Sequence, residues 1–153
     1  MFNRESTVFV STPEFLIGNA PIMEVQEKIN NKVPHYALSF HSGFRQYDYA
    51  QIDRIETSSS EATIRMIKLE VQNPKGVVNE LICAPNVKIY TRNNSWIPAE
   101  EIDVMDILVD SEDYYCKLLS KNVLRRFKIS NVVKMYVLFN KSAFINNILV
   151  RTD

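Results

Sequence analysis

Apolar and polar side chains alternate along much of the chain with a period of two residues. The clearest run is ATIRMIKLEVQ at residues 62–72, in which apolar residues are interleaved with basic and acidic ones. This alternation is typical of a β-strand, whose successive side chains point to opposite faces. Segments rich in Val, Ile, Tyr, Phe and Thr recur from residue 36 to the end of the chain. The pattern therefore predicts an all-β domain.

Short clusters of turn-forming residues separate these segments. They lie at residues 41–43, 58–60, 73–76, 85–86, 92–95 and 111–113. Because the chain has only three glycines, asparagine is expected to occupy several turn positions with positive φ. Two segments, APIMEVQEKINN at residues 20–31 and PAEEIDVMD at residues 98–106, predict one or two short helical turns.

Length and composition predict one domain covering residues 1–153. A chain of 153 residues with 46% hydrophobic side chains can build one core. Its 18 basic and 18 acidic side chains cancel, so nucleic acid is not an expected partner. The apolar runs are much shorter than the roughly 20 residues that span a bilayer, and the first residues do not form a signal peptide. We therefore expect a soluble, intracellular, cytoplasmic protein that does not bind membranes.

Cysteine and histidine are too few and too scattered to predict a metal site. Cys83 and Cys116 belong to no CxxC or Cys/His pattern, and the histidines are His35 and His41. We predict no metal and no cofactor, and catalysis by histidine is not expected. Two reduced, partly buried thiols are favoured, with a disulfide or a reactive thiol as alternatives.

Four segments, taken in order, resemble the Hint domain, the module shared by inteins and hedgehog autoprocessing domains. TVFVSTPEFLIGNAPIMEVQEKI at residues 7–29 is similar to its opening block, and residues 35–71 are similar to its paired strands. ELICAPNVKIYTRNNSWIPAEEIDVMDILV at residues 80–109 and KMYVLFNKSAFINNILVRTD at residues 134–153 resemble its later blocks. The resemblance covers nearly the whole chain and leaves no room for an inserted endonuclease. It implies a horseshoe of curved β-hairpins that brings the two chain ends together.

The resemblance also implies where the chemistry of protein splicing would lie. Thr7 stands at the position of the nucleophile, usually cysteine or serine, that attacks the preceding carbonyl. Val87 replaces the histidine that protonates the departing amide nitrogen, and Ala84 replaces the threonine three residues earlier. Neither side chain can donate a proton, and losing such an acid typically costs a factor of about 10² to 10⁴.

The last block departs from the family in the same way. Thr152 replaces the asparagine that cyclises, Arg151 replaces the histidine before it, and Val137 replaces an acidic residue. Threonine has no side-chain amide, and arginine stays protonated near neutral pH. Structural positions keep their apolar or turn character: Trp96, Pro98, Ala99, Asp106, Leu108, Phe144, Ile148, Leu149 and Val150. Asn147 and Met105 each stand where the family has a glycine. Asparagine tolerates a positive φ, whereas methionine disfavours it.

The favoured hypothesis is a catalytically inactive Hint-like domain that acts as a structural, binding or assembly module with a protein partner. One alternative is residual self-processing, by N-terminal autocleavage or splicing, with Thr7 as nucleophile. Another is an unrelated all-β module that binds a ligand or nucleic acid, supported by Arg125 and Arg126, although such a pair more often lies on a solvated strand face. Abundant Asn, Lys and Ile would suit an AT-rich genome, which adds the hypothesis of a phage or virus structural protein in a virion.

Overall fold

The computed structural model describes residues 1–41, 44–93 and 95–153. The parts of two predicted turns at Ser42, Gly43 and Asn94 lie outside the described residues. The strands are β1 Phe2–Asn3, β2 Thr7–Ser11, β3 Ile17–Pro21, β4 Tyr36–His41, β5 Gln46–Thr57, β6 Thr63–Gln72, β7 Val78–Cys83, β8 Lys88–Thr91, β9 Ser95–Pro98, β10 Ile107–Val109, β11 Tyr115–Lys128, β12 Val132–Val137, β13 Ser142–Ile145 and β14 Ile148–Arg151. The helices are α1 Ile22–Asn30 and the short 3₁₀ helices η1 Ala99–Glu101 and η2 Ile129–Asn131.

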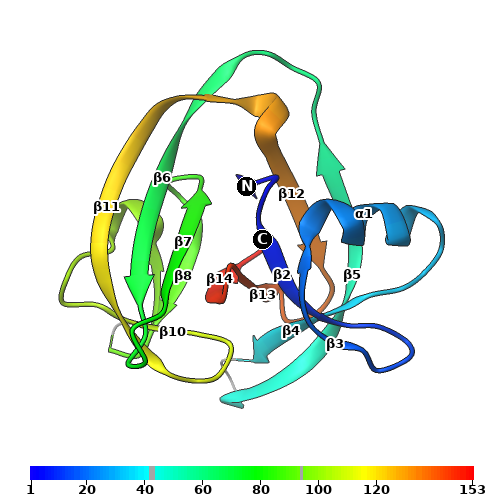
Figure 1. The fold of residues 1–153 in the computed structure, drawn as a ribbon, viewed down its shortest axis with the longest axis horizontal. Helices are drawn as coiled ribbons and strands as arrows, with labels where there is room; N and C mark the ends of the chain where they lie inside the picture. Colours follow the sequence, from blue (N-terminus) through cyan, green and yellow to red (C-terminus); the bar gives the residue numbers. More distant parts are fainter. Residues whose placement is uncertain (42–43, 94) are drawn as a thin grey trace.

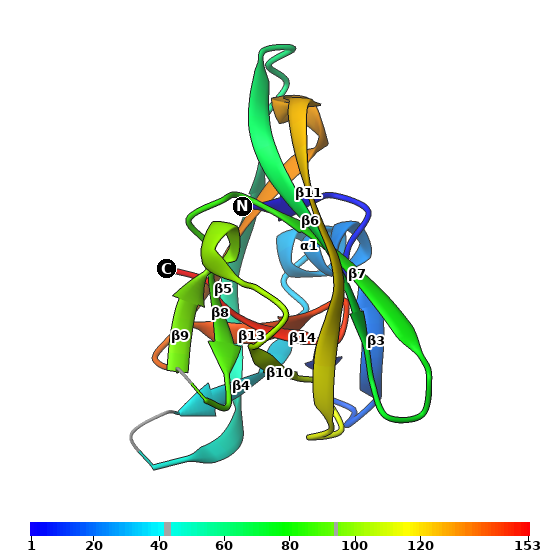
Figure 2. The same cartoon turned by 90° about the vertical axis from the view of Figure 1, so that its left-hand side faces the viewer.

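The prediction of an all-β fold is confirmed. In the described residues, fourteen strands form one sheet in the order β10-β11-β6-β7-β1-β12-β5-β4-β2-β13-β14-β8-β9, with β3 added to β2. Two long ribbons, β6 with β11 and β5 with β12, form the sides of an arch (Figure 1). In Figure 1 both chain ends lie near the middle of the arch, and the side view of Figure 2 shows the C-terminus toward one side of the molecule, beside β9. This is the horseshoe of curved hairpins that the resemblance implies.

The core fills the space between the strands with apolar side chains that the period-two pattern places inward. Its largest fully buried members include Phe2, Phe144, Ile52, Met66 and Leu81. Phe2 is notable because the two-residue strand β1 pairs with β7 on one side and with β12 on the other. The first residues of the chain therefore join the two halves of the sheet.

Two of the three helices, α1 and η1, lie in the predicted segments, whereas the short η2 between β11 and β12 was not predicted. In α1, Ile22 and Val25 lie three residues apart on the buried face, and the helix begins after Pro21, which cannot donate a backbone hydrogen bond. It extends over nine residues, slightly more than two turns. The single turn η1 lies within residues 98–106 as predicted. None of the helices in the described residues is long and apolar enough to cross a membrane.

The turns use positive φ at more residue types than the sequence predicts. Asn146 (φ 49°) and Asn147 (φ 64°) adopt it at the turn between β13 and β14, as expected for asparagine. Phe15, Lys32, Arg45, Ser95, Asp113, Phe139 and Lys141 adopt it too. Asparagine therefore occupies only some of the positions with positive φ. Ser95 and Asp113 lie in predicted turn clusters, and Phe15, Lys32, Arg45, Phe139 and Lys141 lie outside them. Met105 does not take a positive φ, so its turn avoids the strain expected for methionine.

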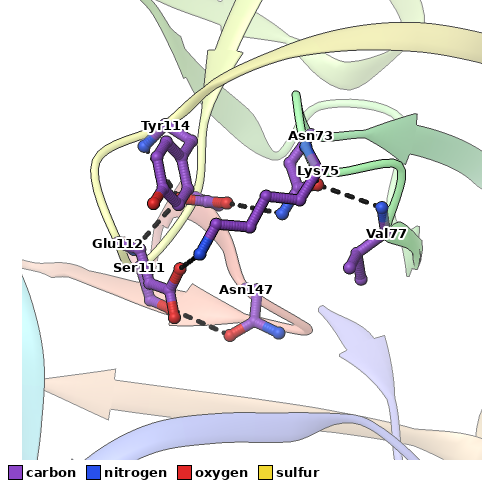
Figure 3. Close-up of polar contacts among 8 residues, drawn as sticks. Asn73, Lys75, Val77, Ser111, Glu112, Tyr114 and Asn147 are labelled. Atoms are coloured by element: carbon purple, nitrogen blue, oxygen red, sulfur yellow. Dashed lines mark hydrogen bonds and ion pairs between the residues drawn. The ribbon is translucent and has the colours of Figure 1, made fainter.

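A polar network ties the turn at Asn147 to neighbouring hairpins. The Asn147 Oδ1 atom accepts hydrogen bonds from Ser111 Oγ (2.9 Å) and Asn19 Nδ2 (3.0 Å). Figure 3 shows the Ser111 contact beside Lys75, whose Nζ atom lies 3.8 Å from Glu112 Oε2 and 4.9 Å from the Tyr114 ring centre. The network holds the ends of several hairpins together at the side of the sheet remote from the chain ends.

Candidate functional site

A cavity of about 300 Å³ lies where the two chain ends meet. The first and last residues of the chain line it together with side chains from β12 and from the turn before β8. The lining residues are Met1, Phe2, Asn86, Val87, Lys134, Met135, Tyr136, Arg151, Thr152 and Asp153. The resemblance implies the splicing site at this place, which makes the cavity the candidate site.

The N-terminal wall is held by backbone pairing. Phe2 is opposite Cys83 of β7 and Val133 of β12, and the Ala84 N–H donates a hydrogen bond to the Met1 carbonyl oxygen (2.9 Å). Met1 thus reaches the cavity beside the turn that carries Ala84 and Val87. Its thioether has no proton to lose and is only a weak hydrogen-bond acceptor.

The turn from Ala84 to Val87 forms the second wall. The Val87 N–H donates to the Ala84 carbonyl (3.1 Å), and the Val87 carbonyl accepts from the Ala99 N–H (2.8 Å), which ties the turn to η1. Both side chains are buried. The structure places Ala84 and Val87 next to the N-terminal segment, and of this turn Asn86 and the apolar Val87 line the cavity.

The C-terminal wall carries an ion pair. Arg151 donates two hydrogen bonds to the carboxylate of Asp153, from Nε to Oδ1 (3.0 Å) and from Nη2 to Oδ2 (2.6 Å). This contact lowers the pKa of the Asp153 carboxyl, and the guanidinium also lies 5.3 Å from the centre of the Trp96 ring. The Thr152 Oγ1 atom is buried without a hydrogen-bond partner among the described residues. The wall offers a fixed ion pair and one weakly acidic hydroxyl.

The structure does not bring every predicted position to this cavity. Thr7 lies in β2, and both its N–H (2.7 Å) and its Oγ1 hydroxyl (3.2 Å) donate to Asn146 Oδ1. Val137 is buried in the core at the end of β12. Neither residue lines the cavity, whereas Val87, Arg151 and Thr152 do.

Neither histidine lines the cavity. The buried His35 has its Nδ1 atom 3.2 Å from the Val33 carbonyl oxygen. His41 shares a separate cavity of about 150 Å³ with Phe139 and Arg151. In residues 1–41, 44–93 and 95–153, no group of three or more His, Cys, Asp or Glu side chains is arranged to hold a metal ion. The side chains in the cavity can bind apolar groups and anions, and an imidazole for proton transfer is not among them.

Both thiols are buried and unpaired. Burial raises the pKa of Cys83 to about 12, and burial with the nearby Asp110 carboxylate does the same for Cys116. We predict that Ellman's reagent modifies neither thiol in the native protein and both after unfolding, because the thiolate is the reactive form. Rapid modification of a native thiol would contradict this prediction.

The same pKa shifts predict a loss of stability at alkaline pH. Unfolded cysteine ionises near pH 8.5, so below that pH both states hold their protons. Between that pH and about 12 the unfolded chain releases protons that the folded thiols keep. The free energy of unfolding is therefore expected to fall over this range, and to fall less in a Cys83→Ala/Cys116→Ala variant, as denaturant titrations at several pH values would show.

Sequence reasoning missed the contributions of Met1 and Lys134 to the site. A motif comparison starts from a residue type that can react, and methionine and a strand lysine carry no such signal. The pairing of Phe2 with Cys83 and Val133 is what brings Met1 to the cavity, and such long-range pairing cannot be seen in local sequence. Asp153 was missed because it follows Thr152, the position of the cyclising asparagine, and the family pattern assigns it no role.

Comparison with solved structures finds the same architecture in inteins. An intein from a hyperthermophile has a TM-score of 0.78 and 15% sequence identity, with 98% of each chain covered. A bacterial intein-like domain from Clostridium thermocellum has a TM-score of 0.71 and 14% identity over 98% of this chain and 96% of that one. A DnaB intein from Synechocystis sp. PCC 6803 also gives 0.71, at 11% identity, over 99% and 97%.

The sequence itself carries little of this likeness. No protein-family model matches the chain, and no curated protein matches it. The structural likeness extends over nearly the whole chain, and the chain therefore has the Hint fold.

Proposed function

We propose that this Hint-fold domain neither splices nor cleaves itself and that it serves as a structural, binding or assembly module. The observation that carries the proposal is the lining of the cavity at the chain ends. Met1, Val87, Arg151 and Thr152 stand there, where a splicing site needs a nucleophile, an acid and a terminal amide. The chain has the Hint fold, but the residues at the splicing positions are substituted. This contrast favours a role that depends on the shape and surface of the domain and not on splicing chemistry.

At each position in this cavity that the resemblance assigns to a chemical step, and at Met1, the side chain present lacks the group that the step needs. An acyl shift needs a thiol or hydroxyl to attack the preceding carbonyl, and the thioether of Met1 cannot do so. Expulsion of the amide nitrogen needs a proton donor, and Val87 has none to give. Closure of a succinimide needs a side-chain amide, and Thr152 has only a hydroxyl.

The partner that we propose is a protein. The cavity joins apolar side chains, Met1, Val87 and Met135, to the cationic Lys134 and Arg151. Such a mixture suits a polypeptide segment better than a small apolar ligand. A role in an intracellular or virion assembly would be consistent with this chemistry, and no cofactor is needed for it.

The proposal is tested with protein that carries a foreign segment before Met1. We expect the intact mass to stay that of the full chain over several days at neutral pH, because no acyl shift takes place. The measurement is intact-mass spectrometry of timed samples. Loss of the foreign segment together with residues 1–6, by cleavage before Thr7 and at a rate that Thr7→Ala abolishes, would instead support residual self-processing by Thr7.

A single restored residue should not change this outcome. In a Val87→His variant of the same extended protein, we expect no cleavage, because the acid would have no nucleophile or terminal amide to act with. Cleavage by this variant would mean that a working nucleophile survives in the chain.

A further inference from the structure

An irregularity in β11 gathers arginine side chains on one face of the ribbon that β11 forms with β6. Leu124 is opposite Met66, and Phe127 is opposite Ile64, so two residues of β11 face a single residue of β6. This is a β-bulge. The two residues are Arg125 and Arg126, and the residue that they face is Arg65.

The packing shows which way the bulge turns these side chains. Ile64, Leu124 and Phe127 pack against the hydrophobic core, and Met66 is fully buried. Opposed residues of an antiparallel pair share one face, so this face points inward. Arg65 and the bulged pair lie on the other face, and all three are exposed. A bulge re-aims side chains in this way, and here it puts three arginine residues at neighbouring positions on the exposed face.

The charged side chains of β11 are all positive, although the chain as a whole is neutral. β11 has the sequence YCKLLSKNVLRRFK, with five basic and no acidic residues. Glu100 Oε2 accepts from Arg65 Nη2 (2.8 Å), and its carbonyl accepts from Lys121 Nζ (2.8 Å). Arg125 and Arg126 form no ion pair with any described residue. Their charge is available to a partner.

The outer edge of β11 is open as well. β10 covers only Tyr115 to Lys117, and beyond that point β11 has β6 as its one neighbouring strand among the described residues. β11 forms the outer margin of the arch in Figure 1. From Ser120 to Leu124 its pairing with β6 is regular. Leu119 and Val123, 45% and 42% exposed, place apolar side chains along the same stretch.

We propose that β11 binds an acidic, extended segment of a partner protein, which adds as a strand along Ser120 to Leu124 and places its carboxylates against Arg125 and Arg126. Free backbone N–H and C=O groups on a strand edge pair with another polypeptide. Val123 precedes the inward-facing Leu124 and so shares the outer face with the arginines. This favours a peptide that carries apolar and acidic side chains on one face, with the acidic ones at the end next to Arg125 and Arg126. The phosphates of nucleic acid could bind the arginines but could not pair with the backbone N–H and C=O groups of the strand edge. The chain has no net positive charge that would attract nucleic acid over a wider surface.

The basic residues and bulges of β11 also protect the edge against pairing with other copies, as such features do in many sheets. Protection alone predicts no affinity for an acidic strand. It predicts aggregation when the charges are removed. Binding and solubility of charge variants therefore separate the two roles.

The test uses a blocked synthetic peptide about eight residues long, with threonine at every second position and, at the positions between, valine in one half and glutamate in the other. We expect it to bind the folded chain in a fluorescence anisotropy titration, and to bind the variant Arg125→Glu/Arg126→Glu at least about tenfold more weakly. A peptide N-methylated at alternate residues should lose binding, because it cannot pair with the strand edge. The matched control Lys28→Glu/Lys32→Glu makes the same charge change on exposed residues of α1 and the turn after it and should bind like the parent.

Several outcomes would overturn the proposal. These are no binding at millimolar peptide, equal loss in the control variant, undiminished binding of the N-methylated peptide, or tighter binding of duplex DNA than of the peptide. The inference deepens the proposed binding role. It does not depend on the loss of self-processing, so its failure would leave the mass measurement, and the conclusion drawn from that, unchanged.

Discussion

Replacing Phe2 by alanine is expected to lower the free energy of unfolding by about 3–5 kcal/mol. Phe2 is 1% exposed and is among the largest fully buried side chains. It also belongs to the short strand that joins β7 to β12, so the truncation leaves a hole where the two halves of the sheet meet. The measurement is urea unfolding followed by far-ultraviolet circular dichroism.

A matched control is available at Phe15, which is 82% exposed at the tip of the β2–β3 hairpin. Phe15→Ala should change the free energy of unfolding by no more than about 0.5 kcal/mol, as is usual for surface substitutions. If Phe2→Ala cost less than about 1 kcal/mol, the N-terminal strand would not join the two halves of the sheet as described.

Replacing Asn147 by valine is expected to lower the free energy of unfolding by about 3 kcal/mol, from two separable causes. Its φ of 64° is costly for a β-branched residue. In addition, the amide accepts hydrogen bonds from Asn19 and Ser111 and donates one to Asn79 Oδ1 (3.3 Å). The measurement is again urea unfolding.

Glycine at the same position separates these causes, because it tolerates positive φ and lacks the amide. Asn147→Gly should therefore cost only the hydrogen bonds, about 1–2 kcal/mol. Equal losses for valine and glycine would show that the turn stores no backbone strain. A gain with glycine would show that the amide contacts do not stabilise the fold.

The fold could be predicted well from the sequence because its signals are local. Period-two alternation, as in residues 62–72, marks strands wherever one face is buried. The arrangement of the strands was expected from the four segments that resemble the Hint domain in the same order. The long ribbons of β5, β6, β11 and β12 follow from such runs. The positive φ values of Phe15, Phe139 and Lys141 could not be predicted, because nothing in those side chains favours that conformation and tertiary contacts impose it.

The candidate site could be predicted only in part. Val87, Arg151 and Thr152 lie in or beside recognisable blocks, and all three line one cavity. The assignment of Thr7 as nucleophile stays a prediction, and in the structure that residue lies against Asn146 and not in the cavity. Which part of the N-terminal segment reaches the cavity depends on the pairing of β1 with two distant strands, a long-range contact that a short motif does not encode.

The bulge in β11 shows how a structure can change the interpretation of a motif. In the sequence, Arg125 and Arg126 are a pair of basic residues on a strand, which more often indicates a solvated face and which supports the alternative of a ligand- or nucleic-acid-binding module. Their register against Arg65 turns both to one side. Their positive charges therefore lie next to the open edge of β11, where a further strand could pair. Register and edges result from strand pairing, which is why this surface was not predicted.

The central claim, that the Hint scaffold persists without self-processing, is tested most directly by intact-mass spectrometry of the chain flanked on both sides by foreign polypeptide. Samples are taken over several days at neutral pH, with and without hydroxylamine, which cleaves any ester or thioester formed at the junctions. We predict one mass, that of the uncleaved protein, in every sample. Release of either flank, or a product in which the two flanks are joined, would contradict the account.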